Sequence, residues 1–93
     1  MITHVVAMTF EDKGNREEAK RRLEELPAQI EHIRSMVVGL DVVGDPMGAD
    51  LVLITTHQDV ADLKAYQGHP VHQEFGGWLR PLLASRVVVD YES

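Results

Sequence analysis

The chain has 93 residues, the size of one domain, and we expect residues 1–93 to form a single unit around one modest core. Apolar residues make up 44% and charged residues 26% of the chain, which excludes a disordered or low-complexity protein. Fifteen acidic residues against nine basic ones give a net charge of −6, which argues against nucleic acid as a partner.

The first predicted element is a strand over residues 3–10, where β-branched residues precede a turn at residues 11–14. Alternation puts His4, Val6, Met8 and Phe10 on one face, and Thr3, Val5, Ala7 and Thr9 on the other. Neither face carries a charge, so we expect both to be buried. No basic leader precedes this run and no apolar segment reaches the ~20 residues of a membrane span, so we expect a cytoplasmic protein without signal peptide or membrane partner.

A helical pattern follows over residues 15–33. Asn15 is a suitable N-cap, and Glu18 could complete a capping box with it. Apolar residues recur at helical spacing as Leu23, Leu26, Ile30 and Ile33. Pro27 should break the helix near Leu26, so that residues 28–33 would form a further turn or short helix.

Two strands come next in the chain. Residues 36–43 predict a strand, with Gly39 as a bulge or a point of close approach, and residues 44–50 predict a turn. Residues 51–57 predict a third strand that is apolar on both faces.

The last third of the chain predicts two helices and a strand. Asp59 should cap a helix that runs to about Gln67 and ends at Gly68, and Pro70 suits the first position of the next helix. That helix should continue, bent at Gly76–Gly77 and kinked at Pro81, and residues 86–92 should form the final strand.

The resulting order β-α-β-β-α-β predicts an α+β fold of the ferredoxin-like type. Its helices can cover only one face of a four-stranded sheet. Because the strands are apolar on both faces, the second face needs a cover, and a second copy of the same sheet is the simplest one. We therefore expect a two-fold homodimer with its sheets packed face to face.

The residues that could carry chemistry gather between Tyr66 and Phe75, where two of the five histidines lie. His72 falls in the first turn of a helix, whose positive end would lower its pKa and favour the neutral, basic form. On this interpretation His72 is a general base, and Tyr66 and His4 are hydrogen-bonding groups. The alternative interpretation is structural: His69 caps a helix, His72 is a half-exposed helical residue, and Tyr66 belongs to the core.

Other chemistry has weaker support. His69 and His72 have an H-x-x-H spacing, but Pro70 prevents a regular helical pair and the glutamate of H-E-x-x-H is absent, so we expect no metal site. The chain has no cysteine nucleophile, P-loop, dinucleotide-binding glycine motif or nucleophile elbow. Arg80, beside Trp78, could bind an anion or could be a surface or dimer-contact residue.

Three segments together resemble the stress-responsive dimeric A/B barrel (Dabb) family: His4–Phe10, the Y-x-x-H-P-x-H phrase from Tyr66 to His72, and the ending Ser85–Tyr91. The resemblance spans about residues 2–92. It implies a ferredoxin-like subunit that forms a dimeric α/β barrel. One plant branch, similar to olivetolic acid cyclase, closes a linear polyketide by an aldol step. In that branch the residues matching His72 and Tyr66 act as base and supporting tyrosine, and those matching His4 and His69 line the same pocket.

These considerations lead to three hypotheses. The first is a cofactor-free pocket that binds, and could transform, an apolar carbonyl-bearing or aromatic metabolite, with catalytic His72 and Tyr66 and a lining of His4, Val6, Met8, His69, Phe75 and Trp78. The second is a non-enzymatic structural or ligand-holding dimer associated with stress. The third, on fold analogy alone, is a cofactor-free or haem-related monooxygenase.

Overall fold

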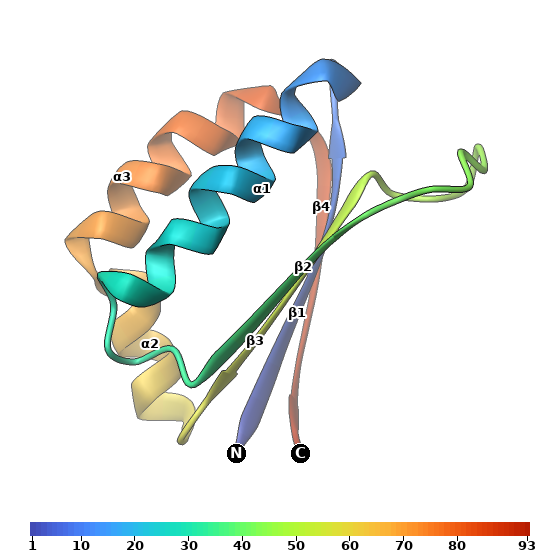
Figure 1. Ribbon diagram of the computed structural model, residues 1–93. Coiled ribbons are helices and arrows are strands. Elements are labelled where there is room, and N and C mark those ends of the chain that lie inside the picture. Colours follow the sequence, from blue (N-terminus) through green and yellow to red (C-terminus); the bar gives the residue numbers. More distant parts are fainter.

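The computed structural model describes all 93 residues as a four-stranded antiparallel sheet with its helices on one face (Figure 1). The strands are β1 (Ile2–Phe10), β2 (Ser35–Leu40), β3 (Leu51–His57) and β4 (Leu83–Glu92), in the order β2-β3-β1-β4. The helices are α1 (Arg16–Glu25), α2 (Val60–Gly68) and α3 (Pro70–Leu79), with short 3₁₀ turns η1 (Lys13–Asn15), η2 (Leu26–Ala28) and η3 (Arg80–Leu82). The predicted ferredoxin-like α+β fold is confirmed.

The first helix breaks where the sequence predicted, near Leu26. It ends at Glu25 because Pro27 cannot donate the next backbone bond, and only the 3₁₀ turn η2 follows. Residues 28–33, predicted as a further turn or short helix, form turns and no helix beyond η2, and Ile30 and Ile33 are buried there. The predicted capping box does not form. Asn15 makes no side-chain cap, and the Asp12 side chain instead accepts a bond from Gly14 N at the start of η1.

The second strand ends three residues earlier than expected, at Leu40. Val42 and Val43 lie in the loop that follows and are 94% and 78% exposed, so their β propensity does not place them in the sheet. Gly39 pairs regularly with Val52, so it forms no bulge. The close approach is present: a Cβ atom on Gly39 would lie 3.3 Å from Val52 Cγ1.

The local signals around α2 and α3 are confirmed. The Asp59 side chain accepts a bond from Asp62 N and caps α2, and Pro70 occupies the first turn of α3. α3 continues through Gly76 and Gly77 to Leu79, and Pro81 lies in the 3₁₀ turn that leads into β4.

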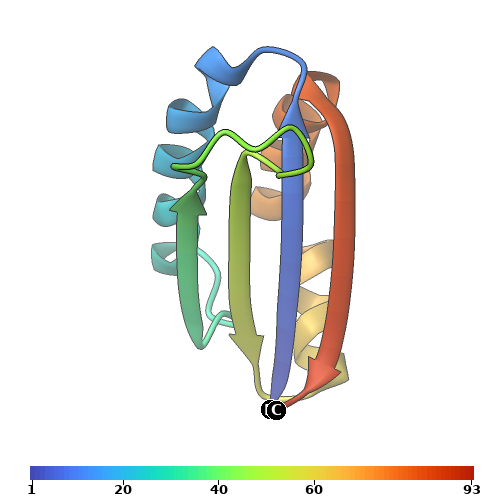
Figure 2. The same cartoon turned by 90° about the vertical axis from the view of Figure 1, so that its right-hand side faces the viewer.

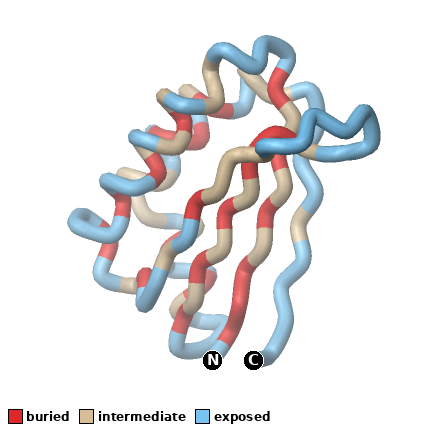
Figure 3. The backbone as a smooth tube through the Cα atoms, turned by 45° about the vertical axis from the view of Figure 1, so that its right-hand side comes forward, coloured by how far each residue is buried: buried red, intermediate tan, exposed pale blue.

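The core lies between the sheet and the helices, where alternate residues of β1 and β3 are buried (Figure 3). The opposite face of the sheet carries no helix (Figure 2). Apolar side chains on that face are about half exposed or more: Val37, Val87, Val89 and Tyr91. The structure thus contains the uncovered apolar face that the strands predicted. None of its helices is both long and apolar enough to cross a membrane.

One buried carboxylate, that of Asp50, links the end of β1 to the start of β3. Asp50 is 1% exposed, and its side chain accepts a 2.9 Å bond from Phe10 N and lies 3.1 Å from Lys13 Nζ. The hydrogen bond from the Phe10 amide is the main cause that lowers the pKa of Asp50. Asp50 therefore fixes the end of β1, and so the direction in which the chain enters α1.

We expect Asp50→Ala to lower the free energy of unfolding by about 1–3 kcal/mol, because it leaves the buried Phe10 amide without a hydrogen-bond acceptor. Asp50→Asn keeps an acceptor oxygen and should cost less than Asp50→Ala. Asp45→Ala is a matched control, because the Asp45 side chain also accepts a backbone bond, from Met47 N, but in an exposed loop. Urea unfolding of the three variants would measure this order, and equal losses for Asp45→Ala and Asp50→Ala would contradict it.

Candidate functional site

A partly enclosed cavity of about 100 Å³ lies between the sheet and the helices. It is lined from β1, α1, β3, α2, α3, η3 and β4, by apolar side chains for the most part. The lining residues are His4, Val6, Met8, Leu23, Leu53, Tyr66, His72, Phe75, Gly76, Leu79, Arg80, Leu83 and Arg86. The fold thus brings residues from both ends of the chain to one enclosed place.

Four rings pack together at this place. The ring centroids of Tyr66 and His72 are 4.6 Å apart in an edge-to-face arrangement, and those of Tyr66 and His57 are 4.9 Å apart. His4 lies 6.2 Å from Tyr66 and 6.3 Å from His57, also edge-on. Tyr66 is therefore the centre of the cluster, in contact distance of every histidine in it.

His72 is the titratable side chain best suited to act as a base. Burial is the main cause that lowers its pKa, so the imidazole is neutral near pH 7. Its Nδ1 atom is buried and has no partner in hydrogen-bond geometry, although the Gln67 carbonyl lies near enough to the ring to act against the lowering of its pKa. A buried polar atom without a partner lowers the stability of a folded protein by about 1–3 kcal/mol, and a catalytic role is one reason why a protein retains such an atom. The sequence predicted the lowered pKa from the helix end, but burial contributes most.

Tyr66 supplies a hydroxyl group beside this base. The residue is 1% exposed, and burial raises its pKa to about 12, so the phenol stays protonated. No group of the protein bonds its hydroxyl, although the residue lines the cavity. Tyr66 can therefore donate a hydrogen bond to a ligand oxygen.

His4 is held in place by the neighbouring strand. It is 2% exposed, and its Nδ1 makes a hydrogen bond with the Asp90 carboxylate of β4. The two residues face each other because β1 and β4 pair antiparallel with His4 opposite Asp90. A carboxylate partner fixes the orientation of a histidine ring and leaves its other nitrogen for the cavity.

His57 belongs to the ring cluster, but both of its ring nitrogens are bonded within the protein. Its Nε2 lies 2.8 Å from Thr55 Oγ1 and its Nδ1 lies 2.8 Å from the His32 carbonyl oxygen. Burial lowers its pKa. Because both ring nitrogens have protein partners, His57 positions Tyr66 and is not itself available to a ligand.

Six of the eight residues that the sequence analysis assigned to a pocket line this cavity together: His4, Val6, Met8, Tyr66, His72 and Phe75. The other two do not. His69 is the N-cap of α3, and its Nδ1 accepts a 3.1 Å bond from Val71 N, as in the structural alternative considered above. Trp78 is half-buried and packs outside this cavity, where the Arg22 guanidinium lies 4.0 Å from its ring centroid.

The sequence analysis did not assign three polar residues near the cavity to the site: Asp90, Arg86 and Arg80. Arg80 was considered only as an anion-binding or surface residue. On β4 the residues Arg86, Val88 and Asp90 alternate with outward ones, and they pair with Met8, Val6 and His4. Pairing the first and last predicted strands antiparallel would have shown that this face of β4 borders the site. The register needed for that step was not available from the sequence.

The histidines and carboxylates do not assemble into a metal site. No group of three or more histidine, aspartate or glutamate side chains has the spacing that would hold an ion. The H-x-x-H pair is separated in space, because His69 serves as a cap while His72 turns into the cavity.

Comparison with known proteins gives a family match over nearly the whole chain. The family described as "Stress responsive A/B Barrel Domain" matches residues 2–93. Comparison with curated protein sequences gives no match.

Solved structures with the same fold are numerous. A dimeric ferredoxin-like protein of unknown function from Bacteroides fragilis is 30% identical, with a TM-score of 0.87 over 99% of this chain and 95% of that one. A dimeric ferredoxin-like protein of unknown function from Thermobifida fusca is 25% identical, with a TM-score of 0.87 over 99% of this chain and 90% of that one. A hydroxynitrile lyase from Passiflora edulis is 18% identical, with a TM-score of 0.84 over 97% of this chain and 90% of that one, and shares the fold alone.

The lowered pKa values of two histidines lead to a prediction about how stability depends on pH. The folded pKa values of His57 and His72 lie below the ordinary value of about 6.5. As pH falls through 6.5 towards those values, the unfolded chain takes up protons that the folded chain does not. The free energy of unfolding should therefore fall, by up to about 1.4 kcal/mol per pH unit for each histidine.

Denaturant unfolding between pH 7.5 and 5.5 measures this dependence. His72→Gln should reduce the slope of the free energy of unfolding against pH, whereas Lys64→Gln, on the exposed side of α2, should retain it. A slope that is the same in wild type and His72→Gln would contradict the assignment of a depressed pKa to His72.

Proposed function

The chain belongs to the stress-responsive A/B barrel domain family, and we propose that it binds a small carbonyl compound and removes a proton next to the carbonyl without a cofactor. His72 is the base and Tyr66 the hydrogen-bond donor. The observation that carries the proposal is the neutral, half-buried His72, whose buried Nδ1 atom has no hydrogen-bond partner and whose ring packs edge-on against the phenol of Tyr66.

The chemistry follows from the two protonation states. The neutral imidazole of His72 takes a proton from the carbon next to the carbonyl, which leaves an imidazolium and an enolate. The phenol of Tyr66 donates a hydrogen bond to the carbonyl oxygen, where the negative charge develops. His4, held by Asp90, is the second polar group that this oxygen can meet. Return of the proton regenerates the enzyme, and attack of the enolate on a second carbonyl would be the aldol closure of a cyclase.

Cavity size restricts the ligand. About 100 Å³ is less than the ~150 Å³ of a cavity that binds benzene, and well below the ~300 Å³ of an ordinary ligand pocket. The cavity therefore accepts a molecule of a few non-hydrogen atoms, or the reactive end of a longer one. A haem group does not fit this volume, which disfavours the haem-related monooxygenase.

The same small volume favours a second candidate function, that of a structural dimer with no ligand. On that interpretation the rings of His4, Tyr66 and His72 are core residues, and the unpaired nitrogen of His72 is the cost of their packing. The two candidates differ in one measurable respect, because only the first predicts catalysis that depends on His72.

We expect the protein to speed exchange of the methyl-ketone protons of small ketones with deuterium in D₂O, followed by NMR. His72→Gln should lower the rate by about 100-fold or more, the usual worth of a general base. Tyr66→Phe should lower it too, by loss of the hydrogen bond to the enolate. The wild-type rate should be constant near neutral pH and fall in acid, at the depressed pKa of His72.

His32→Gln is the matched control for these variants. His32 is half-buried and bonds Asp62 outside the cavity, so its loss should leave the exchange rate unchanged. Exchange that is equally fast in wild type and His72→Gln would exclude the base and favour the structural dimer.

We also propose that the chain forms a homodimer through the uncovered face of its sheet. Val87 and Val89 are 63% and 57% exposed on this face, and the loop over residues 41–50 projects from the same side with Val42 and Met47 both 94% exposed (Figures 1 and 2). Contiguous apolar surface of this kind marks an interaction site. Two relatives with the same fold are described as dimeric, which supports a second copy as the occupant.

Light scattering at micromolar concentration should give the mass of two chains for the wild type. Val87→Glu should give the mass of one chain, because it places a charge in the middle of the apolar face opposite Ala7. Val60→Glu replaces another exposed valine, on α2, and should leave the mass of two chains unchanged. Circular dichroism would show that each variant is folded, and a wild-type mass of one chain would refute the dimer.

A further inference from the structure

We propose that the ligand of the cavity is a short oxo acid, whose carboxylate is bound at the cavity mouth by Arg80 and Arg86 while its carbonyl end reaches the part of the cavity that Tyr66 and His72 line. The inference rests on the proposed function for the carbonyl chemistry. The recognition of a carboxylate rests on separate observations about the two arginines.

The first observation is their position. Arg86 lies on the helix-facing side of β4, opposite Met8, and Arg80 follows α3 at the start of η3. Both line the same cavity as His72 and Tyr66, although they come from different elements. Both residues are exposed overall, so they stand where the cavity meets solvent. Their charges also act on His72, where each lowers the pKa of the imidazole, and this is a sign of proximity.

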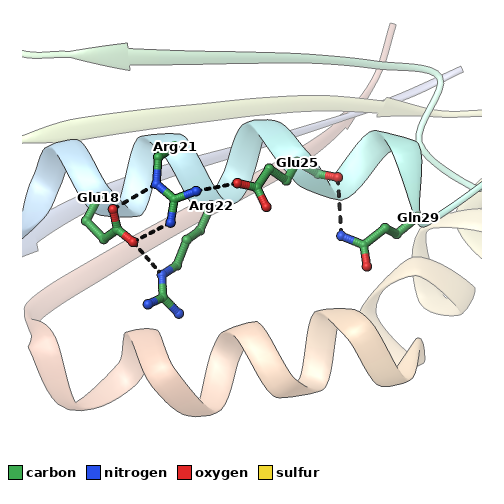
Figure 4. A network of polar contacts seen from close by, with 5 residues as sticks. All are labelled: Glu18, Arg21, Arg22, Glu25 and Gln29. Atoms are coloured by element: carbon green, nitrogen blue, oxygen red, sulfur yellow. Dashed lines mark hydrogen bonds and ion pairs between the residues drawn. The ribbon is translucent and has the colours of Figure 1, made fainter.

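The second observation is that neither guanidinium has a partner within the chain. The other four arginines are all bonded: Arg21 and Arg22 to Glu18 on α1 (Figure 4), Arg16 to the Asp41 carbonyl oxygen, and Arg34 to Gln58. Arg80 and Arg86 thus differ from the other four arginines in that their guanidinium donors have no acceptor from the protein. An incoming carboxylate would satisfy donors that the protein leaves free.

The third observation is that α3 makes room for one of these side chains. A Cβ atom on Gly76 would lie 3.2 Å from Arg80 Nη2 and 3.4 Å from Arg80 Cζ. The guanidinium therefore folds back over the bare backbone at Gly76, which itself lines the cavity. An alanine at this position would push Arg80 away from the place it now occupies.

The chemistry of an oxo acid fits this arrangement. A guanidinium offers paired N–H donors that match the two oxygens of a carboxylate. With a net charge of −6 the protein as a whole repels anions, so a local pair of positive charges is needed to hold one. The same charges favour the enolate that forms when His72 takes the proton, and they keep His72 neutral beforehand.

The experiment compares matched pairs of probes that differ in the carboxylate. Pyruvate is paired with hydroxyacetone, and 4-oxopentanoate with 2-pentanone. Each is titrated into the ¹⁵N-labelled protein, with the amide signals of Gly76 and Gly77 as reporters of the cavity wall. Deuterium exchange into the same compounds is followed separately, so that binding and catalysis are measured independently.

We expect each oxo acid to bind more tightly than its neutral counterpart. Arg80→Gln and Arg86→Gln should each weaken oxo-acid binding by about tenfold, the loss expected of one charge-assisted hydrogen bond, and leave the binding of the neutral ketones unchanged. Gly76→Ala should weaken oxo-acid binding through Arg80. Arg34→Gln removes a charge of the same kind from the surface and should change neither.

Three results would overturn the inference: equal affinity for oxo acids and neutral ketones, an equal loss in Arg34→Gln, or a change in molecular mass in the Arg80 and Arg86 variants, which would make them contacts of the partner subunit. Exchange of neutral ketones that depends on His72, without preference for a carboxylate, would refute this inference and leave the proposed function standing. Arginine-dependent binding of oxo acids without deuterium exchange would support the carboxylate site and refute the proposed function.

Discussion

The pairing of β1 with a strand on each side is the constraint on which the rest of the structure depends. β3 and β4 both run antiparallel to it, and their register places Thr55 and Asp90 beside His4. Since side chains alternate along a strand, this register decides which residues face the helices and which face outward. A shift of one residue would turn His4 and Met8 out of the cavity and put Thr3 and Ala7 into it.

Burial then decides the chemistry of the residues that the register brings together. Removal from water raises the pKa of Tyr66 and lowers the pKa of His72, so the phenol keeps its proton and the imidazole is neutral. One donor and one acceptor of protons thus stand next to each other near pH 7. The opposite directions of the two shifts have a single cause, the desolvation that disfavours the charged form of either group.

The two faces of the sheet contribute to different parts of the structure. The inner face builds the core and the cavity, and the outer face, with Val87 and Val89, is free for the proposed second subunit. Because successive residues of β4 point to opposite faces, Arg86 and Val88 lie on the cavity side and their neighbours lie on the outer side. A substitution at Val87 can therefore test the assembly without removing a cavity residue.

The sequence by itself determined the element order, the ends set by Pro27, Asp59 and Pro70, and the apolar character of both sheet faces, because these follow from local backbone chemistry and from alternation along the chain. It also identified Tyr66 and His72, which lie close in the chain. It did not determine that Trp78 stacks on Arg22, nor that Asp90 and Arg86 border the cavity. Those contacts join residues far apart in sequence, and only the strand register and the packing of α3 on the sheet decide whether such residues meet.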